Sequence, residues 1–205
     1  RQKIFLTFLF LLIVGCILLR FSKFSGRQEE AHQINAACEA YRDEVSSEAA
    51  QYDMSKYVDL ILAVMMQESS GQGTDPMQSS EGAYNTRYPQ QPNGITDPSY
   101  SISCGIQELK YALDKAGCTG PTDLSKIRLA LQAYNFGADS YFAYLEENGQ
   151  TVWTAQSAQA FAQMASGGTQ RDEDDPLHDP AGPWDYGDQY YPDHVLRYYH
   201  LDNNS

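Results

Sequence analysis

Residues 57–81 read Y-V-D-L-I-L-A-V-M-M-Q-E-S-S-G-Q-G-T-D-P-M-Q-S-S-E. The first half predicts a buried helix, because apolar side chains recur at the three- and four-residue spacing that places them on one helical face. This face is formed by Tyr57, Ile61, Val64 and Met65. Glu68 continues the same face one turn later, where a leucine would be expected. The stretch therefore predicts a helix that carries an acid at the C-terminal end of its buried face.

The position of Glu68 predicts an unusual acid. Its carboxyl group is held away from water and lies in the last helical turn, where the helix dipole is negative, so we expect a raised pKa. Gly71 and Gly73 then end the helix and allow the backbone to approach a ligand closely. A neutral acid on a rigid helix suits a glycosidase, which must protonate a leaving oxygen. The alternative is that Glu68 points into solvent at a frayed helix end.

Charge is divided unevenly along the 205 residues. The first 27 residues carry five basic side chains and no acid, whereas the rest of the chain carries 9 basic side chains against all 27 acids. A body with this charge repels nucleic acid and anionic lipid, so we expect neither as a partner of the globular part. The length suits one core of ordinary size and an appendage.

The appendage is an unbroken apolar run at residues 4–19, which reads I-F-L-T-F-L-F-L-L-I-V-G-C-I-L-L between Lys3 and Arg20. As a helix it reaches roughly 24 Å, a little short of the ~30 Å hydrocarbon layer, but long basic side chains at its ends can snorkel. We predict a membrane signal anchor over residues 1–21, with residues 4–21 in the membrane and the remaining domain outside the cell. A cleaved signal peptide and a lipoprotein modified at Cys16 are the alternatives.

The remainder of the chain predicts a mainly α domain. An amphipathic segment at residues 29–52 is either a linker or the first helix packed on the domain, and residues 71–97 form a long loop. Further helices are expected at residues 101–116, 124–134, 138–146, 154–164 and 193–200. We find no convincing strand beyond short pieces, no repeat and no second domain.

The cysteines and acids predict no metal or cofactor. Cys38, Cys104 and Cys118 have no zinc-binding spacing and no paired histidine near them. If the segment from Cys104 to Cys118 is helical, its ends lie about 20 Å apart, beyond the ~7 Å that a disulfide tolerates. Pairing of Cys38 with either of them stays open. The acidic stretch at residues 166–189 is interpreted as a solvated loop, because it lacks the alternation of a calcium-binding loop.

Short motifs in a fixed order indicate a family. They are Glu68-Ser69, Met77-Gln78, Ser101-Ile102 with Gly105 and Leu109, the run A-Y-N-F-G at residues 133–137, and Tyr191 with Val195 and Tyr198. Together they resemble the soluble lytic transglycosylase and goose-type lysozyme superfamily. The phrases D-P-M-Q-S-S-E and A-Y-N-F-G resemble more closely the lysozyme-like domain of CwlT-type cell-wall hydrolases and of vaccine-antigen-A proteins.

The resemblance implies the fold and the site. It implies a mainly α, lysozyme-like helical domain with a long substrate-cleft loop at residues 54–205, after a joint and linker helix at residues 22–53. Glu68 is then the catalytic acid. Tyr191 hydrogen-bonds and orients it, although the adjacent Tyr190 leaves the register open by one. The residues that bind substrate are Ser69, Gln78, Tyr134, Asn135 and Tyr191. Amide side chains suit this role, since they offer both a donor and an acceptor to an acetamido group.

The implied substrate is the glycan strand of peptidoglycan, cut by a monomeric domain at the β-1,4 bond between N-acetylmuramic acid and N-acetylglucosamine. If water attacks with inversion, a second carboxylate is needed about 6.5–9.5 Å from the acid. Asp75, Glu81 and Asp97 are the candidates, and Glu81 is chosen because it belongs to the M-Q-S-S-E phrase. If the sugar's own hydroxyl attacks, a lytic transglycosylase results. A non-catalytic peptidoglycan-binding or assembly protein is the third alternative.

Overall fold

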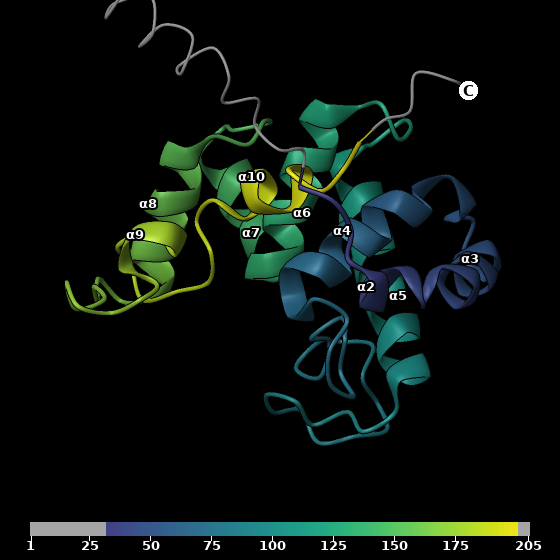
Figure 1. Cartoon of the computed structure of the whole chain (residues 1–205). Coiled ribbons are helices and arrows are strands. Elements are labelled where there is room, and N and C mark those ends of the chain that lie inside the picture. Colours follow the sequence, from purple (N-terminus) through teal and green to yellow (C-terminus); the bar gives the residue numbers. More distant parts are fainter. Residues whose placement is uncertain (1–31, 201–205) are drawn as a thin grey trace, which may run out of the picture. The chain divides into compact units, whose positions relative to one another are not determined.

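The computed structural model describes residues 32–200, which are mainly helical (Figure 1). A 3-10 turn, η1 (Ser55–Tyr57), precedes the acid-bearing helix. The helices are α2 (Ala36–Glu39), α3 (Arg42–Gln51), α4 (Val58–Ser69), α5 (Pro98–Ala116), α6 (Leu124–Phe136), α7 (Ala138–Glu147), α8 (Ala155–Ala165), α9 (His178–Ala181) and α10 (Tyr191–Leu196). Within residues 32–200 there is no β-strand, only an isolated antiparallel bridge between Gln170 and Trp184. The mainly α prediction is confirmed.

Helix α4 lies at the centre of the core. Six consecutive residues, Leu60 to Met65, are fully buried, so the helix is covered on all sides and not along one stripe as the sequence predicted. This is expected of a helix that is apolar all round. Helices α2, α3 and α10 pack against it. The helix ends at a residue whose backbone is in the left-handed conformation, but this residue is Ser70, with φ 55°, and not the expected Gly71.

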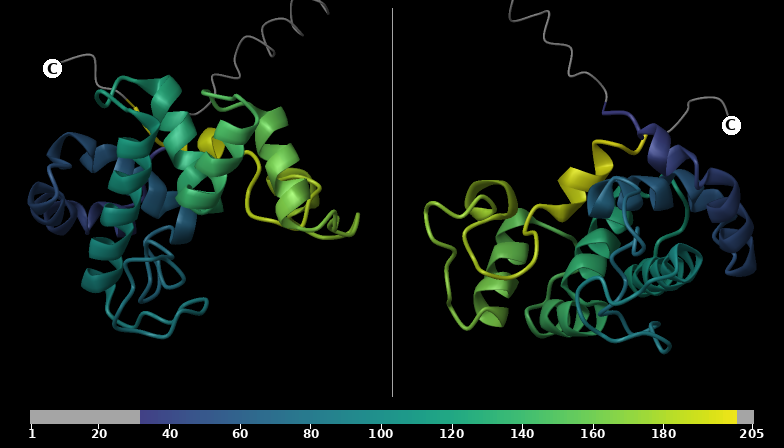
Figure 2. Two further views of the ribbon diagram at one scale, coloured as in Figure 1. Left: turned by 180° about the vertical axis from the view of Figure 1, so that it is seen from behind. Right: turned by 60° about the horizontal axis from the view of Figure 1, so that its bottom comes forward.

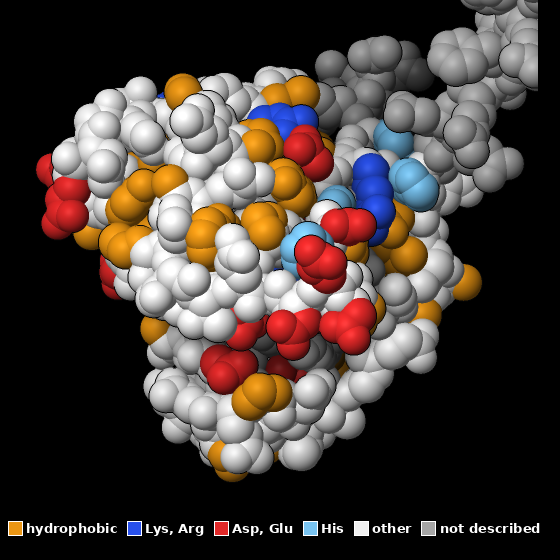
Figure 3. Space-filling model, turned by 90° about the vertical axis from the view of Figure 1, so that its left-hand side faces the viewer, with side chains coloured by type: hydrophobic (Ala, Val, Ile, Leu, Met, Phe, Trp, Pro, Cys, Tyr) orange, Lys and Arg blue, Asp and Glu red, His pale blue; other side chains and the backbone are white. Residues whose placement is uncertain are grey.

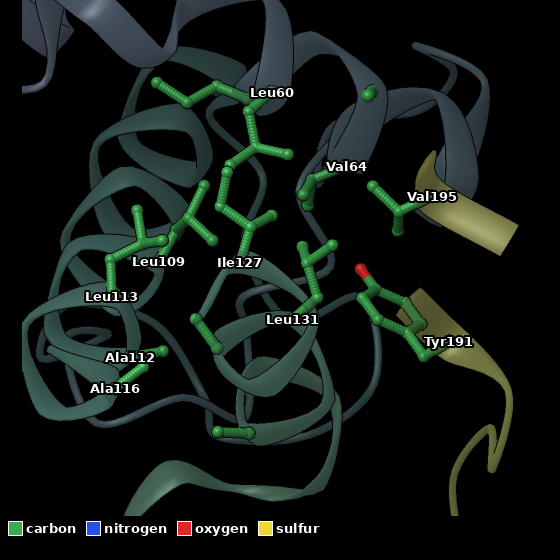
Figure 4. Packing of buried hydrophobic residues seen from close by; sticks show 14 of the residues in the cluster. Leu60, Val64, Leu109, Ala112, Leu113, Ala116, Ile127, Leu131, Tyr191 and Val195 are labelled. Atoms are coloured by element: carbon green, nitrogen blue, oxygen red, sulfur yellow. The ribbon is translucent and has the colours of Figure 1, made fainter. Parts of the chain in front are cut away.

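Helices α5 and α6 form the closest pair in the structure, and α10 packs against α6. Figure 4 shows side chains from α4, α5, α6 and α10 directed into one cluster, with Leu131 of α6 beside Tyr191 of α10. Helix α5 begins three residues earlier than predicted. Asp97 caps it by accepting from the backbone N–H groups of Ser99 and Tyr100, and a proline follows at the first helical position. Both are ordinary start signals for a helix.

The segment between α8 and α10 runs back across α8 (Figure 2). An aromatic cluster joins Tyr186 of this segment to α6, α7 and α8, with stacked, tilted and edge-on pairs whose ring centroids are 5.1–5.8 Å apart; its members are Phe136, Tyr141, Phe161 and Tyr186. Arg171 is buried and donates to backbone carbonyl groups of the same segment. The prediction of a solvated loop was therefore incomplete, because Arg171 and the aromatic side chains hold it, and a short helix, α9, lies within it.

The amphipathic segment near the N-terminus packs on the domain. It is broken at Ala40 and Tyr41 into α2 and α3, which contact α4 and α5. Asn35 caps α2 by accepting from the Cys38 backbone N–H at 2.8 Å. The cysteines at positions 38, 104 and 118 are free thiols. No helix in residues 32–200 is long and apolar enough to span a membrane. The predicted anchor at residues 1–21 lies outside the described residues.

We expect Leu131→Ala to destabilise the domain by about 2–5 kcal/mol, because the fully buried side chain leaves a cavity between α4, α6 and α10. The measurement is denaturant unfolding followed by circular dichroism. Leu124→Ala, in the same helix but 44% exposed, is the matched control, with an expected change within about 0.5 kcal/mol. Equal effects of the two substitutions would contradict this description of the core.

Candidate active site

Glu68 lies in the last turn of α4 and faces the first residue of α10. The Tyr191 hydroxyl donates a hydrogen bond to Glu68 Oε1. Tyr191 is 2% exposed, whereas part of the Glu68 side chain remains accessible to solvent. The hydrogen bond that the resemblance implied is therefore present and joins residues 123 positions apart. The adjacent Tyr190 points elsewhere, since its hydroxyl accepts from Gln159 Nε2 at 2.7 Å.

The surroundings of Glu68 favour its neutral form. Burial, the largest cause, raises the pKa of Glu68; the hydrogen bond from Tyr191 lowers it, and the negative charges of Asp188 and Asp75 raise it, to a net value of about 7. Burial, together with the charge of Glu68, raises the pKa of Tyr191 well above its ordinary value, so this hydroxyl remains a donor. A large share of the Glu68 carboxyl groups is therefore neutral at pH 7.

Tyr134 forms the second wall around the acid. Its ring stacks on that of Tyr191, with centroids 6.3 Å apart and planes inclined by 21°. Its hydroxyl donates to the backbone carbonyl of Met77 at 2.9 Å, so α6 is tied to the loop that follows α4. The predicted Tyr134 and Gln78 are therefore brought to the same corner as Glu68 by one hydrogen bond.

Asn135 holds the opposite side of the site. Its Oδ1 accepts from the backbone N–H of Asp188 at 2.8 Å. The Nδ2 group makes no hydrogen bond with the residues that the structure describes, so it is available to an acceptor on a ligand. Asp188 is fixed by its own contacts, a 2.6 Å contact between Oδ2 and His194 Nδ1 and a bond from the Tyr190 N–H to Oδ1. No motif or spacing in the sequence singled out Asp188 or His194.

Asp75 organises the long loop from beneath. It is 1% exposed, and its Oδ1 accepts from Ser101 Oγ at 2.6 Å and from the Ser79 N–H at 3.1 Å. Its Oδ2 accepts from the N–H and the hydroxyl of Ser80. Ser101 in turn accepts from the Met77 N–H at 3.1 Å. One buried carboxylate therefore ties the loop to α5.

Gln78 and Ser69, two further residues that the resemblance implied to bind substrate, both make hydrogen bonds within the loop that follows α4. Gln78 is exposed, with φ 48°, and its Nε2 donates to Asp75 O and to Asn93 Oδ1. Ser69 Oγ donates to the Pro76 carbonyl at 2.8 Å and accepts from the Gly71 N–H. Ser69 thus closes the turn after α4, and a direct contact with substrate stays a prediction.

The three candidates for a second carboxylate differ sharply. Asp75 is enclosed by the loop and Asp97 caps α5. Glu81 is exposed and makes no hydrogen bond or ion pair with the described residues. Its role as the second carboxylate stays a prediction. Figure 3 shows acidic side chains gathered around a hollow on one face of the molecule, which suits chemistry that uses carboxyl groups.

Glu108 of α5 is an acid that the sequence reading missed. Burial raises its pKa to about 7, backbone N–H groups of Tyr84 and Ala83 lower it, and the charges of Asp75 and Glu68 raise it. A Cβ atom on Gly82 would lie 1.4 Å from Glu108 Oε1. The spacing held a signal, because Glu108 follows the buried Ser101 and Cys104 at helical intervals, as Glu68 follows its own apolar face.

We expect Gly82→Ala to destabilise the protein by about 1–3 kcal/mol, because the added methyl group overlaps the buried Glu108 carboxyl. Urea unfolding checks this value. The matched control is the same substitution in a Glu108→Ala background, where the methyl group has room and most of the effect should disappear. Additive effects of the two substitutions would show that the carboxyl does not occupy this space.

Known proteins share this arrangement of the chain. Residues 36–199 match the family model described as Lysozyme-like. Bifunctional muramidase/DL-endopeptidase CwlT of Bacillus subtilis (strain 168) is 35% identical over 173 residues, which are 84% of this chain and 43% of that protein. Pneumococcal vaccine antigen A homolog of Streptococcus pyogenes serotype M1 is 37% identical over 110 residues, 54% of this chain and 50% of that protein.

A solved structure agrees with these matches. It is a protein of Staphylococcus aureus subsp. aureus Mu50, described as similar to lipoprotein, NLP/P60 family, with a TM-score of 0.69 and 27% identity over 85% of this chain and 56% of that chain. The chain thus spans about half the length of the proteins it matches. The resemblance read from the sequence is confirmed, and so is the lysozyme-like helical fold. The chain belongs to the lysozyme-like family.

Proposed function

We propose that this protein is an N-acetylmuramidase, which cleaves the β-1,4 bond between N-acetylmuramic acid and N-acetylglucosamine in peptidoglycan. The observation that carries the proposal is the Glu68 carboxyl group, which is bonded by Tyr191 and has a pKa of about 7. Such a group donates its proton to a glycosidic oxygen at neutral pH. Membership of the lysozyme-like family and the muramidase named among its relatives support this substrate.

In the proposed reaction, Glu68 protonates the leaving oxygen as positive charge builds on the sugar ring. Tyr191 holds the carboxyl group in one orientation, and the hydrogen bond remains while the group loses its proton. Asn135 Nδ2 donates to the acetamido oxygen of the sugar, and Gln78 lies at the loop side of the same corner. Glu81 activates the water that attacks from the opposite face, because its exposed carboxylate is not engaged by the described residues.

Cleavage of a peptide bond is a second candidate activity, since CwlT is also named as an endopeptidase. Amide cleavage by a cysteine requires a thiol with a lowered pKa. Burial instead raises the pKa of Cys38 to about 11 and also raises the pKa of Cys104. These two buried thiols are therefore unsuited to nucleophilic attack.

We also propose that the enzyme is held at the cell membrane by residues 4–21, with its catalytic domain on the cell-wall side. The unbroken apolar run and its basic flanks support this location. A membrane-held enzyme meets its substrate at the inner surface of the wall, where the strongly acidic body needs no electrostatic attraction to it.

We expect Glu68→Gln to reduce turnover of peptidoglycan at least about 100-fold, because the amide has nearly the same shape but donates no acidic proton. Its carbonyl can still accept from Tyr191, so the melting temperature should change little. Mass spectrometry of the released fragments measures the activity. Glu146→Gln, at an exposed site on α7, is the control. Undiminished turnover by Glu68→Gln would remove the assignment.

The same fragments distinguish the possible reactions. Reducing ends indicate hydrolysis, and 1,6-anhydro ends indicate a lytic transglycosylase, in which Glu81→Gln would have no effect. Retention of peptidoglycan without any fragments indicates a binding or assembly protein and would contradict the enzymatic proposal.

We expect kcat/KM to fall about tenfold per pH unit above pH 7, because only neutral Glu68 donates a proton. Tyr191→Phe removes the hydrogen bond that lowers the pKa of Glu68, so this fall should move to higher pH. Tyr190→Phe, which removes the bond to Gln159 instead, should leave it in place. If the fall of kcat/KM with pH is the same in Tyr191→Phe, a group other than Glu68 controls it. Glu108 is then the candidate, because its pKa is also raised to about 7, and Glu108→Gln tests it.

A further inference from the structure

A second hollow lies beside the loop, away from the acid. It has a volume of about 520 Å³ and is bounded by the end of α3, the first three turns of α5 and residues 83–87. Helices α3 and α5 lie side by side here (Figure 1). None of the groups around the acid, namely Glu68, Asp75, Tyr134, Asp188 and Tyr191, lines it. This hollow is therefore a separate pocket, which we name the tyrosine pocket.

Three tyrosines give the pocket rigid aromatic walls. Tyr52 shares a 3.2 Å hydrogen bond with Ser103 Oγ. The Tyr100 hydroxyl donates to Tyr84 O at 3.2 Å and accepts from the Thr86 N–H at 3.0 Å. Because both hydroxyls are anchored, the rings are held in place before any ligand arrives. Flat aromatic faces of this kind suit the C–H faces of a sugar ring.

Some polar groups that line the pocket make no hydrogen bond with the described residues. Gln107 Nε2 donates to the Ser103 carbonyl at 3.1 Å. Its Oε1 accepts no hydrogen bond from residues 32–200. Ser99 also lines the pocket and is exposed. An acceptor and a hydroxyl beside aromatic faces match the amide N–H and hydroxyl groups of an N-acetylated sugar.

Arg87 supplies the charge. Its guanidinium group lies 4.6 Å from the centroid of the Tyr100 ring, and no carboxylate of the described residues pairs with it. Arg42 and Arg128, by contrast, each pair with an aspartate. The acid of the pocket, Asp97, directs Oδ1 to the backbone N–H groups of Ser99 and Tyr100. The Arg87 guanidinium is therefore able to pair with a carboxylate on a ligand.

We propose that the tyrosine pocket binds an amino sugar that carries a carboxylate, which in the cell wall is a muramyl unit whose lactyl carboxyl group carries no stem peptide. The ring lies against the tyrosines, the acetamido group meets Gln107, and the carboxylate pairs with Arg87. This assignment of the ligand rests on the proposed function, because it takes the wall glycan as the polymer that the protein meets.

The pocket and the catalytic region share one piece of backbone. Tyr84 lines the pocket and its carbonyl accepts from Tyr100, while its backbone N–H lowers the pKa of the buried Glu108. A muramyl unit in the pocket therefore fixes the loop that borders the catalytic acid. The pocket holds the wall polymer at a second point while Glu68 acts on another bond.

The test uses the full chain with Glu68→Gln, so that no ligand is cleaved, and N-acetylmuramic acid, whose lactyl carboxylate is free, as the probe in calorimetric titration. Arg87→Met should weaken binding about tenfold or more, the loss expected for one charge-assisted contact, and Arg87→Lys should restore part of it. Arg128→Met is the matched control, because this guanidinium also lies over an aromatic ring, 5.3 Å from Trp153, outside the pocket. It should bind as the parent does.

N,N′-diacetylchitobiose, which has no carboxylate, should bind equally with and without Arg87. The proposal is overturned if Arg87→Met binds the muramyl probe as tightly as the parent, or if Arg128→Met weakens binding equally. Peptidoglycan turnover by the wild-type chain is measured in parallel. Absence of turnover together with Arg87-dependent binding would remove the muramidase proposal alone. Turnover with Arg87-independent binding would remove the pocket alone.

Discussion

The structure depends on one carboxyl group that is withdrawn from water without being neutralised by a cation. A buried carboxylate without a positive partner is costly, so the pKa of the group is raised, and the group accepts from a single hydroxyl. For Glu68 this requires α4 to be covered by α10, so that Tyr191 lies at its end. The core and the surroundings of Glu68 are thus built by the same packing.

The loop between α4 and α5 also contains a buried carboxyl group without a cation beside it, that of Asp75. Asp75 is as deeply buried as the core, but its oxygens accept from two serine hydroxyls and two backbone N–H groups. Asp75 is thus held by four hydrogen bonds where Glu68 accepts from one hydroxyl, and the charge of Asp75 contributes to the raised pKa of Glu68.

Much of this was readable from the sequence because the signals were local. The spacing of apolar residues predicted the helices, and the position of Glu68 predicted its raised pKa. The features that could not be predicted depend on contacts between segments that are distant in the sequence. Complete burial of α4 needs α2, α3 and α10 together, Asp188 becomes relevant only because Asn135 binds its backbone 53 residues away, and the place of Arg171 depends on carbonyl groups that follow it. Glu108 had a local signal, but its neighbour Gly82 belongs to another segment.

The close approach at Gly105 has a further consequence. A Cβ atom there would come within 2.6 Å of the Met77 side chain, so the loop rests directly on the backbone of α5 with no layer between them. Any side chain at this position would press on Met77, whose carbonyl accepts from the Tyr134 hydroxyl. The absence of a side chain on one residue of α5 thus sets how closely the loop, and with it the contact to α6, can approach.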